Sequence, residues 1–353
     1  MSLDKGYWVT PSHTIAAGVG LSVLDIVAVS LRFVARRKQR QPLKADDWFM
    51  VPATLFTLGI GIAMVYGASK TALAHPLVVP SELNGSFVDL QSEQISVEGA
   101  IQWAYTLMLP LALGCTKVSF LFFYRRLFVV NKRSSNNVFL IGMIMFVFLW
   151  MVGFFLTFLF QCRLNFWALW TSPTAIAEHC TSDTPINLAF TITDLITDVA
   201  ILVIPIPIIW RLNLSLSRKM SITAVFLFGA ITVAASLTRV VLTARIFVEA
   251  FTADADPILI VTAFIYWGMI ETGIAVFTAC LPTVWFFFRG WSWDPVVKVA
   301  RSIMESSASS IRLLKTKTSS INVADGDSLN AEVEKAQFST TPSGRSVAGP
   351  RSS

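Results

Sequence analysis

The chain has 353 residues, of which 54% are hydrophobic and 14% are charged, and its formal net charge is +6. Soluble domains carry about 25% charged residues, so a chain of this length and composition cannot hide its apolar side chains inside a globular core. The composition therefore argues against a soluble protein and predicts an integral, multi-pass membrane protein whose main partner is the lipid bilayer.

Seven apolar runs are long enough to cross a membrane as helices. They predict an all-α fold, a seven-helix membrane domain over residues 14–288, preceded by a short external segment at 1–13. No cleavable signal peptide is recognisable before the first run, because Met1 to Pro11 contains charged and aromatic residues and no apolar core. The seven runs cover residues 14–35, 47–68, 100–124, 138–160, 186–210, 220–247 and 259–288.

Basic residues gather in the short loops of one side, with twelve there and three on the other. Because positive loops stay in the cytoplasm, we expect the N-terminus outside and the C-terminus inside. The net charge then reflects topology and contact with lipid headgroups, and we expect no nucleic acid partner. The twelve are Arg36, Arg37, Lys38, Arg40, Lys44, Arg125, Arg126, Lys132, Arg133, Arg211, Arg218 and Lys219, and the three are Lys5, Lys70 and Arg163.

Two acids open the second predicted helix. We interpret Asp46 as its N-cap and Asp47 as a first-turn residue, because anions satisfy the free amides of a helix start. A signalling contact is the alternative. The outer loop that follows, residues 69–98, contains Asn84-Gly85-Ser86, a glycosylation acceptor on the side predicted to be external.

The third predicted helix contains a lysine within the apolar region. Lys117 lies seven residues before Tyr124, which places it about 10 Å inside the inner boundary at ~1.5 Å per residue. It either extends its ammonium group to the interface or pairs with a buried acid.

Two cysteines fall in the external loop at 161–185, and the other two fall inside predicted helices. A disulfide between Cys162 and Cys180 is the favoured pairing on the oxidising side of the membrane. The histidines at positions 13, 75 and 179 do not show metal-ligand spacing, so we expect no metal site.

The fifth predicted helix is the most informative stretch. Asn187, Thr191, Asp194 and Asp198 are spaced 4, 3 and 4 apart, so they form one polar stripe on a helix whose other sides are apolar. Acids at this depth in a membrane pair with cations or take part in function.

Depth counting suggests partners for these acids. Asp198 and Lys117 are within reach between the third and fifth helices, and Asp194 lies at a height that Arg239 can reach from the sixth. We expect these two pairs to clamp the three helices together. Glu271, on the same face of the seventh helix as Trp267, and Asp25 of the first helix are then expected in or beside a central cavity.

Three interpretations of the buried acids stay open. They form salt bridges that only fix the packing, or they line a ligand cavity, or they form a proton relay or an acid/base catalyst. No nucleophile or cofactor motif accompanies them, so an enzyme is the less favoured class. The cavity residues would be Asn187, Asp194, Asp198, Trp267 and Glu271.

The composition changes after the last apolar run. Residues 289–317 form a basic juxtamembrane segment suited to the inner leaflet, and residues 318–353 form a Ser/Thr-rich cytoplasmic tail that we expect to be disordered.

An ordered set of motifs extends over residues 14–288 and resembles the fungal rhodopsin-like domain family of seven-helix membrane proteins. The resemblance implies a fungal source, a seven-helix bundle and an association with secondary-metabolite, mycotoxin-type gene clusters; Pth-type receptor-like proteins are more distant members. The motifs are Arg32, Arg36 and Arg37 followed by Asp46-Asp47-Trp48, KVSFLFFYRRLF from Lys117, Cys162 and Cys180 with Trp167, Asn187 with Thr193-Asp194, IPIPIIWRL from Ile204, Arg239, Trp267 with Glu271, and ACLPT from Ala279.

Three departures narrow the expected activity. Residues 259–288 contain no lysine, so no retinal Schiff base is available and we expect no cofactor. The third helix ends in Tyr124-Arg125-Arg126 instead of an acid-Arg-Tyr triplet, and about thirteen residues precede the first run where receptor-like relatives carry a cysteine-rich domain. Coupling to a G protein by the animal-receptor mechanism is therefore not supported.

Three functions follow from these observations. The first is an accessory or receptor-like component of a biosynthetic pathway that binds a small apolar molecule in a polar intramembrane cavity, in the plasma membrane or an endomembrane. The second is a Pth-type sensor of extracellular cues with a cytoplasmic signalling partner. The third is an intramembrane acid/base enzyme or a transporter of the pathway product, for which no inverted pair of broken helices is visible.

Overall fold

The computed structural model describes residues 9–76, 93–129, 135–171, 173–206, 216–249 and 257–288, and within these ranges it contains helices and turns but no strand. Residues Met1–Phe287 belong to one compact unit. The predicted juxtamembrane segment, the predicted tail and the glycosylation acceptor Asn84 lie outside the described residues.

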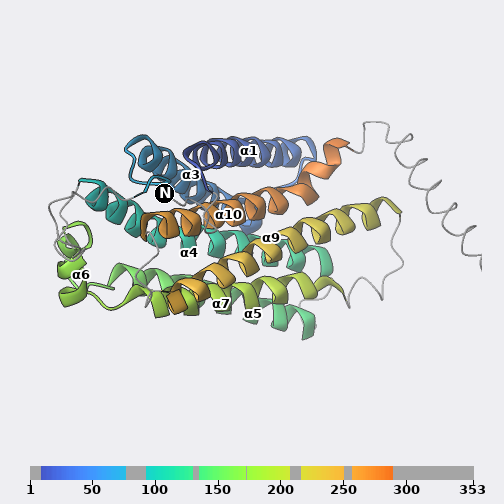
Figure 1. Ribbon diagram of the computed structural model, residues 1–353. Coiled ribbons are helices and arrows are strands. Elements are labelled where there is room, and N and C mark those ends of the chain that lie inside the picture. Colours follow the sequence, from blue (N-terminus) through green and yellow to red (C-terminus); the bar gives the residue numbers. More distant parts are fainter. Residues whose placement is uncertain are drawn as a thin grey trace, which may run out of the picture. The chain divides into compact units, whose positions relative to one another are not determined.

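Long helices lie side by side through this unit (Figure 1). Within the described ranges, six of them are long and apolar enough to cross a membrane, so the protein is an integral multi-pass membrane protein. The sixth predicted run lies in α9, which is helical over 34 residues but is not one of these six. The elements are α1 (Pro11–Lys38), α2 (Ala45–Trp48), α3 (Met50–Ser69), α4 (Glu93–Phe128), α5 (Ser135–Leu159), η2 (Phe166–Trp170), α6 (Pro173–His179), α7 (Asp183–Val203), α9 (Leu216–Glu249) and α10 (Pro257–Phe288).

The second helix begins differently from the prediction. Lys44, not Asp46, is the N-cap of α2, and Asp47 accepts a hydrogen bond from the Lys44 backbone N–H at 3.3 Å. Asp46 faces inward, where two arginine side chains reach its carboxylate. The expected N-cap role of Asp46 is therefore wrong, because ion pairing to α1 positions the side chain.

Helix α4 lies inside the bundle and α5 lies outside it. In the most apolar 18-residue window of each helix, 67% of the residues of α4 are buried, against 28% for α5. Helix α4 packs between α3 and α5, α1 packs on α3, and α7 packs on α9. The inner position of α4 explains how a polar residue in its middle can meet residues of several other helices.

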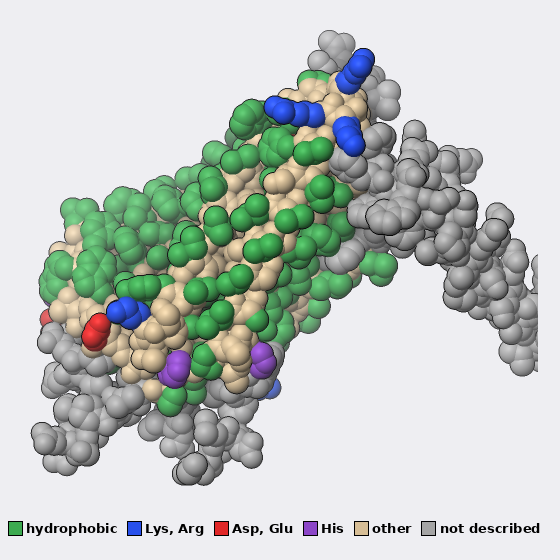
Figure 2. Space-filling view, turned by 90° about the horizontal axis from the view of Figure 1, so that it is seen from above, with side chains coloured by type: hydrophobic (Ala, Val, Ile, Leu, Met, Phe, Trp, Pro, Cys, Tyr) green, Lys and Arg blue, Asp and Glu red, His purple; other side chains and the backbone are tan. Residues whose placement is uncertain are grey.

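Helix α7 turns its polar stripe inward and an apolar stripe outward. Ile192, Ile196, Val199 and Val203 are 41–60% exposed, whereas Thr191 and Asp194 are completely buried. This arrangement is reversed relative to a soluble helix and is the one expected when hydrocarbon is the solvent. Figure 2 shows hydrophobic side chains covering one face of the molecule between two ends that carry the charged ones.

The loop after α5 is closed by the expected disulfide between Cys162 and Cys180. The loop contains η2 and α6, and it is fixed to α4 by a hydrogen bond from the Ser96 hydroxyl to the Trp170 carbonyl oxygen at 2.8 Å. Gly99 permits this close approach, because a Cβ atom there would lie 2.5 Å from the carbonyl oxygen of Leu169.

Candidate functional site

Asp194 lies at the centre of a buried charge network. One of its carboxylate oxygens is 2.6 Å from the Lys117 ammonium group of α4, and the other is 3.0 Å from the Arg239 guanidinium group of α9. All three side chains are at most 5% exposed. The expected pair between Asp194 and Arg239 is present, and Asp194 also holds a second cation.

Lys117 is bound inside the bundle and does not extend toward the interface. Its ammonium group is 2.8 Å from Asp198, and it donates hydrogen bonds to the Thr197 hydroxyl at 2.7 Å and the Asp194 carbonyl oxygen at 3.0 Å. It also lies 5.1 Å from the centre of the Trp150 ring, where a cation is attracted by the π face. The second expected pair, Lys117 with Asp198, is therefore also present.

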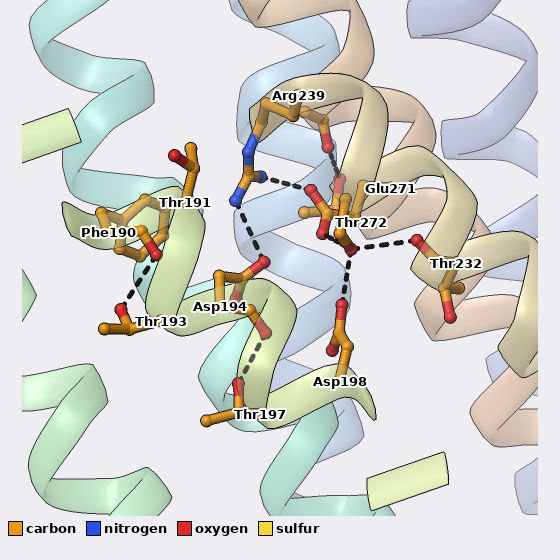
Figure 3. A network of polar contacts seen from close by, with 12 residues as sticks. Phe190, Thr191, Thr193, Asp194, Thr197, Asp198, Thr232, Arg239, Glu271 and Thr272 are labelled. Atoms are coloured by element: carbon orange, nitrogen blue, oxygen red, sulfur yellow. Dashed lines mark hydrogen bonds and ion pairs between the residues drawn. The ribbon is translucent and has the colours of Figure 1, made fainter. Parts of the chain in front are cut away.

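Arg239 continues the network to α10. Its guanidinium group pairs with the Glu271 carboxylate and lies 5.3 Å from the centre of the Phe190 ring. Figure 3 shows Arg239 directed at both Asp194 and Glu271. The network thus joins four helices, α4, α7, α9 and α10, whereas depth counting predicted a clamp of three with Glu271 left over.

The Ser236 hydroxyl bridges the two remaining carboxylates. It contacts Asp198 at 2.6 Å, Glu271, and the carbonyl oxygen of Thr232 at 2.9 Å. A hydroxyl has one hydrogen to donate, and an ionised carboxylate can only accept. With both acids ionised, at least one of these contacts would set two acceptors against each other. A proton on Asp198 or Glu271 would remove the conflict between the two carboxylates.

Charge counting also favours one proton on these acids. Two cations face three acids, which leaves one negative charge in excess if all five groups are ionised. Oxygens of Asp194, Asp198 and Glu271 lie within 4.8 Å of one another, a spacing that would suit a metal ion. Lys117 and Arg239 already neutralise most of this charge, so a proton is sufficient to complete the balance.

A cavity of about 50 Å³ lies beside the network. Lys117, Asp198 and Glu271 are its charged residues, and its other walls are largely apolar side chains of α4, α7, α9 and α10. This volume accepts a few water molecules or the polar end of a ligand, whereas sites for whole drug-sized molecules measure about 300–1,000 Å³. The apolar walls are Leu113, Phe120, Ile201, Leu202 and Ala275.

Three other predicted site residues lie apart from the ion pairs. Asn187 is buried two helical turns before Asp194, and the half-buried Trp267 ring meets Tyr266 edge-on. Asp25 is 1% exposed, and neither carboxylate oxygen has a hydrogen-bond partner among the described residues. Its depth was expected to bring it near Glu271, but it lies outside the ion-paired network.

A second buried cluster was not predicted as such. Arg32 and Arg36 of α1 face Asp46 and Asp47 of α2 in four ion pairs of 2.8–3.2 Å. Arg32 also donates a hydrogen bond to the carbonyl oxygen of Ala279 in α10 at 2.6 Å. The sequence pattern that could have predicted this cluster is a pair of arginines one helical turn apart, followed after a short loop by two adjacent acids.

Ser236 is the other residue that sequence reasoning missed. A serine in an apolar helix is common, because its hydroxyl can bond to the preceding turn. Its position three residues before Arg239 was the available signal, since residues at this spacing share a helix face.

The chain belongs to the family described as the fungal rhodopsin domain, whose model matches residues 31–290. It is 25% identical over 262 residues to the polyenoic acids biosynthesis gene cluster protein Ba17b of Metarhizium anisopliae, covering 73% of this chain and 68% of that protein. It is 26% identical over 298 residues to the phomoidride biosynthesis cluster protein H of a fungal species, covering 79% of this chain and 89% of that protein.

A receptor is also among its relatives. The chain is 24% identical over 284 residues to receptor GIN3 of Arthrobotrys oligospora, which covers 74% of this chain and 59% of that protein. No solved structure matches the chain.

Proposed function

We propose that this fungal rhodopsin domain protein is a receptor-like, seven-helix component of a secondary-metabolite pathway that binds a small molecule at its buried charge network. Relatives named for two biosynthesis clusters support the pathway role, and receptor GIN3 supports a receptor-like mechanism. Mycotoxin-type products are the substance class that this role would serve.

In this proposal α9 is also a membrane helix, and the N-terminus lies outside. The buried Arg239 on α9 pairs with acids of α7 and α10, while Leu227, Ile231, Leu237 and Val241 are 45–60% exposed as on the other lipid-facing helices. The asymmetry of basic residues between the loops supports the orientation.

The proposal rests on two observations. The network contains one more acid than it has cations, and this additional acid borders a cavity. Asp198 and Glu271 share the Ser236 hydroxyl at the cavity wall, so a ligand group that donates hydrogen bonds or carries positive charge can replace the proton between them. A carboxylic acid fits this wall poorly. The expected ligand is therefore a mainly apolar molecule with an amine or hydroxyl at one end.

Binding there would change how the helices pack. A group that contacts Glu271 competes with Arg239 for the same carboxylate, which weakens the link between α9 and α10. A ligand can shift such an equilibrium only through its different affinities for the two arrangements. The network holds four helices together through few side chains, so a ligand that replaces one of its contacts can have different affinities for the two arrangements.

A matched series of probes tests the ligand class. The full chain in detergent is titrated with decylamine, decanol and decanoic acid, and its thermal unfolding midpoint is recorded. We expect the amine to raise the midpoint most and the acid least, and we expect Glu271→Gln to abolish the order. Asp25→Asn is the control, because it makes the same chemical change at a buried acid outside the network. An unchanged order in Glu271→Gln would contradict the proposed site.

The biological role is tested in the source fungus. A deletion strain is compared by metabolite profiling with strains that carry Glu271→Gln or Asp25→Asn at normal protein levels. Accumulation of an intermediate in the deletion and Glu271→Gln strains indicates a pathway component. A change in cluster transcripts without an intermediate indicates a sensor. A normal profile in Glu271→Gln beside an altered deletion strain would refute a role for the cavity.

A second candidate, a sensor of an external cue, is favoured by a cavity of about 200 Å³ under the disulfide-closed loop. Gln102, Trp103 and Trp170 line it, and the Trp103 ring lies 6.1 Å from the Trp170 ring. Replacement of Trp103 by Ala should abolish a response to an external cue while leaving decylamine binding unchanged; loss of both would argue against a separate outer site.

A further inference from the structure

A third cavity, of about 380 Å³, lies between the turn before α2 and the facing ends of α4 and α5. It shares no lining residue with the cavity at the charge network. Its volume falls within the range of sites that bind small organic molecules. Its polar walls are Lys44, Asp46, Arg125, Arg126 and Asn137.

The two acids near this cavity, Asp46 and Asp47, are already neutralised by ion pairs. Asp46 and Asp47 are paired with Arg32 and Arg36, two cations for two anions. Lys44, Arg125 and Arg126 add three positive charges around the cavity. Among the residues that the structure describes, their one ion pair is the contact of Arg126 with Asp46 at 3.8 Å, which is too long for a hydrogen bond.

The two arginine groups are held in place, and one donor of Arg126 is unused within the described residues. Arg125 Nε donates to the Asn137 side-chain oxygen at 2.9 Å, and Arg126 Nη2 donates to the Gln41 side-chain oxygen. Arg126 Nη1 is buried without a hydrogen-bond partner in the described part of the chain. A buried N–H group of this kind is costly unless a ligand or water accepts from it.

We propose that this cavity binds a phosphorylated ligand, with its phosphate between Lys44, Arg125 and Arg126. Guanidinium groups match phosphate oxygens in pairs, and a dianionic phosphate would balance most of the three charges. Basic pockets between membrane helices at the headgroup level are suited to phosphorylated lipid headgroups. The volume accommodates an inositol phosphate headgroup and not only a bare ion. This site is independent of the ligand proposed for the charge network.

Binding is measured on the full chain in neutral phosphatidylcholine nanodiscs. Inositol trisphosphate and inorganic phosphate are titrated as soluble probes, and phosphatidylinositol bisphosphate is incorporated in a separate set of discs. We expect saturable binding that the variants Lys44→Gln and Arg126→Gln each weaken about tenfold, since each removes a charge-assisted contact. Lys44 is exposed, so its replacement keeps the test valid if Arg126→Gln does not fold.

Arg37→Gln is the matched control, because it removes one exposed positive charge from the same end of the bundle outside the cavity. We expect it to change affinity less than about twofold at physiological salt, where exposed charges are screened. Equal weakening by Arg37→Gln, or unchanged binding in both cavity variants, would overturn the proposal.

The probes separate the two sources of phosphate. Tight binding of inositol trisphosphate and of the bisphosphate lipid, with weak competition by inorganic phosphate, assigns a lipid headgroup. Equal competition by inorganic phosphate assigns a soluble phosphate compound. Absence of saturable binding by every probe refutes the site.

Discussion

The protein contains two buried charge clusters that differ in construction. In the cluster of Arg32, Arg36, Asp46 and Asp47, charges balance and no pair is more than 15 positions apart in the chain. In the central network the acids outnumber the cations, and the members come from four helices. The balanced cluster joins α1 to the neighbouring α2 and, through Arg32, to α10, whereas an unbalanced network between distant segments can change with a proton or a ligand.

The largest expected effect comes from removing the cation that the central network cannot replace. Arg239→Ala leaves Glu271 unpaired and Asp194 with Lys117 alone, so we expect a loss of about 3–5 kcal/mol, which is enough to remove most folded protein. The yield of monodisperse protein in detergent and its thermal midpoint measure this loss. Arg245→Ala, at an exposed position of the same helix, should be near neutral. A stable Arg239→Ala protein would mean that the network does not hold the bundle.

The two acids of α7 should respond unequally. Asp194→Asn removes the charge that two cations share, and we expect a loss of about 3 kcal/mol. Asp198→Asn removes the excess charge while its amide oxygen can still accept from Lys117, so we expect a change within about 1 kcal/mol. Equal losses in denaturant unfolding of the two variants would contradict the uneven charge balance.

A double-mutant cycle compares the two clusters directly. For Arg36→Gln and Asp46→Asn we expect single losses of about 1–3 kcal/mol and a double variant that loses less than their sum, because the double variant leaves Arg32 paired with Asp47 and so restores the charge balance. For Arg239→Gln and Glu271→Gln we expect weaker coupling, because Asp194 still faces the altered arginine site. Identical coupling energies from the two unfolding series would erase the distinction.

A modest effect is expected at the Ser236 bridge. Ser236→Ala removes the hydroxyl between Asp198 and Glu271, and we expect a loss of about 1–2 kcal/mol because both carboxyls lose a buried partner. Thr238→Ala, whose hydroxyl bonds only within its own helix among the described residues, serves as the control in the same thermal unfolding assay. A neutral Ser236→Ala variant would remove the argument for a shared proton.

The hydropathy of the sequence and the spacing of its polar residues were sufficient to predict much of the fold. The apolar runs located the helices with bounds that differ by at most seven residues, and the 4, 3, 4 spacing on α7 identified its buried face before any neighbour was known. Depth counting also found the pairs of Lys117 with Asp198 and Asp194 with Arg239, since the rise per residue of a helix is constant.

The same reasoning failed where rotation about a helix axis matters. Asp25 and Glu271 were assigned similar depths, yet Glu271 pairs with Arg239, and Asp25 lies outside the network. Asp46 was assigned a capping role from local sequence alone, while its carboxylate is held by Arg32 and Arg36. Depth is a property of one segment, but the direction of a side chain toward another helix depends on how the two segments pack.

The sequence by itself therefore determined that this protein resides in the membrane, where its helices run, and that the acids of α7 are buried, because these properties depend on local hydropathy and helical period. Only the tertiary structure decided that Lys117 joins both α7 acids, that the Ser236 hydroxyl lies between the carboxylates of Asp198 and Glu271, and that three cations surround a cavity at the end of α4. These relations depend on the distances between helices, which no single stretch of the chain encodes.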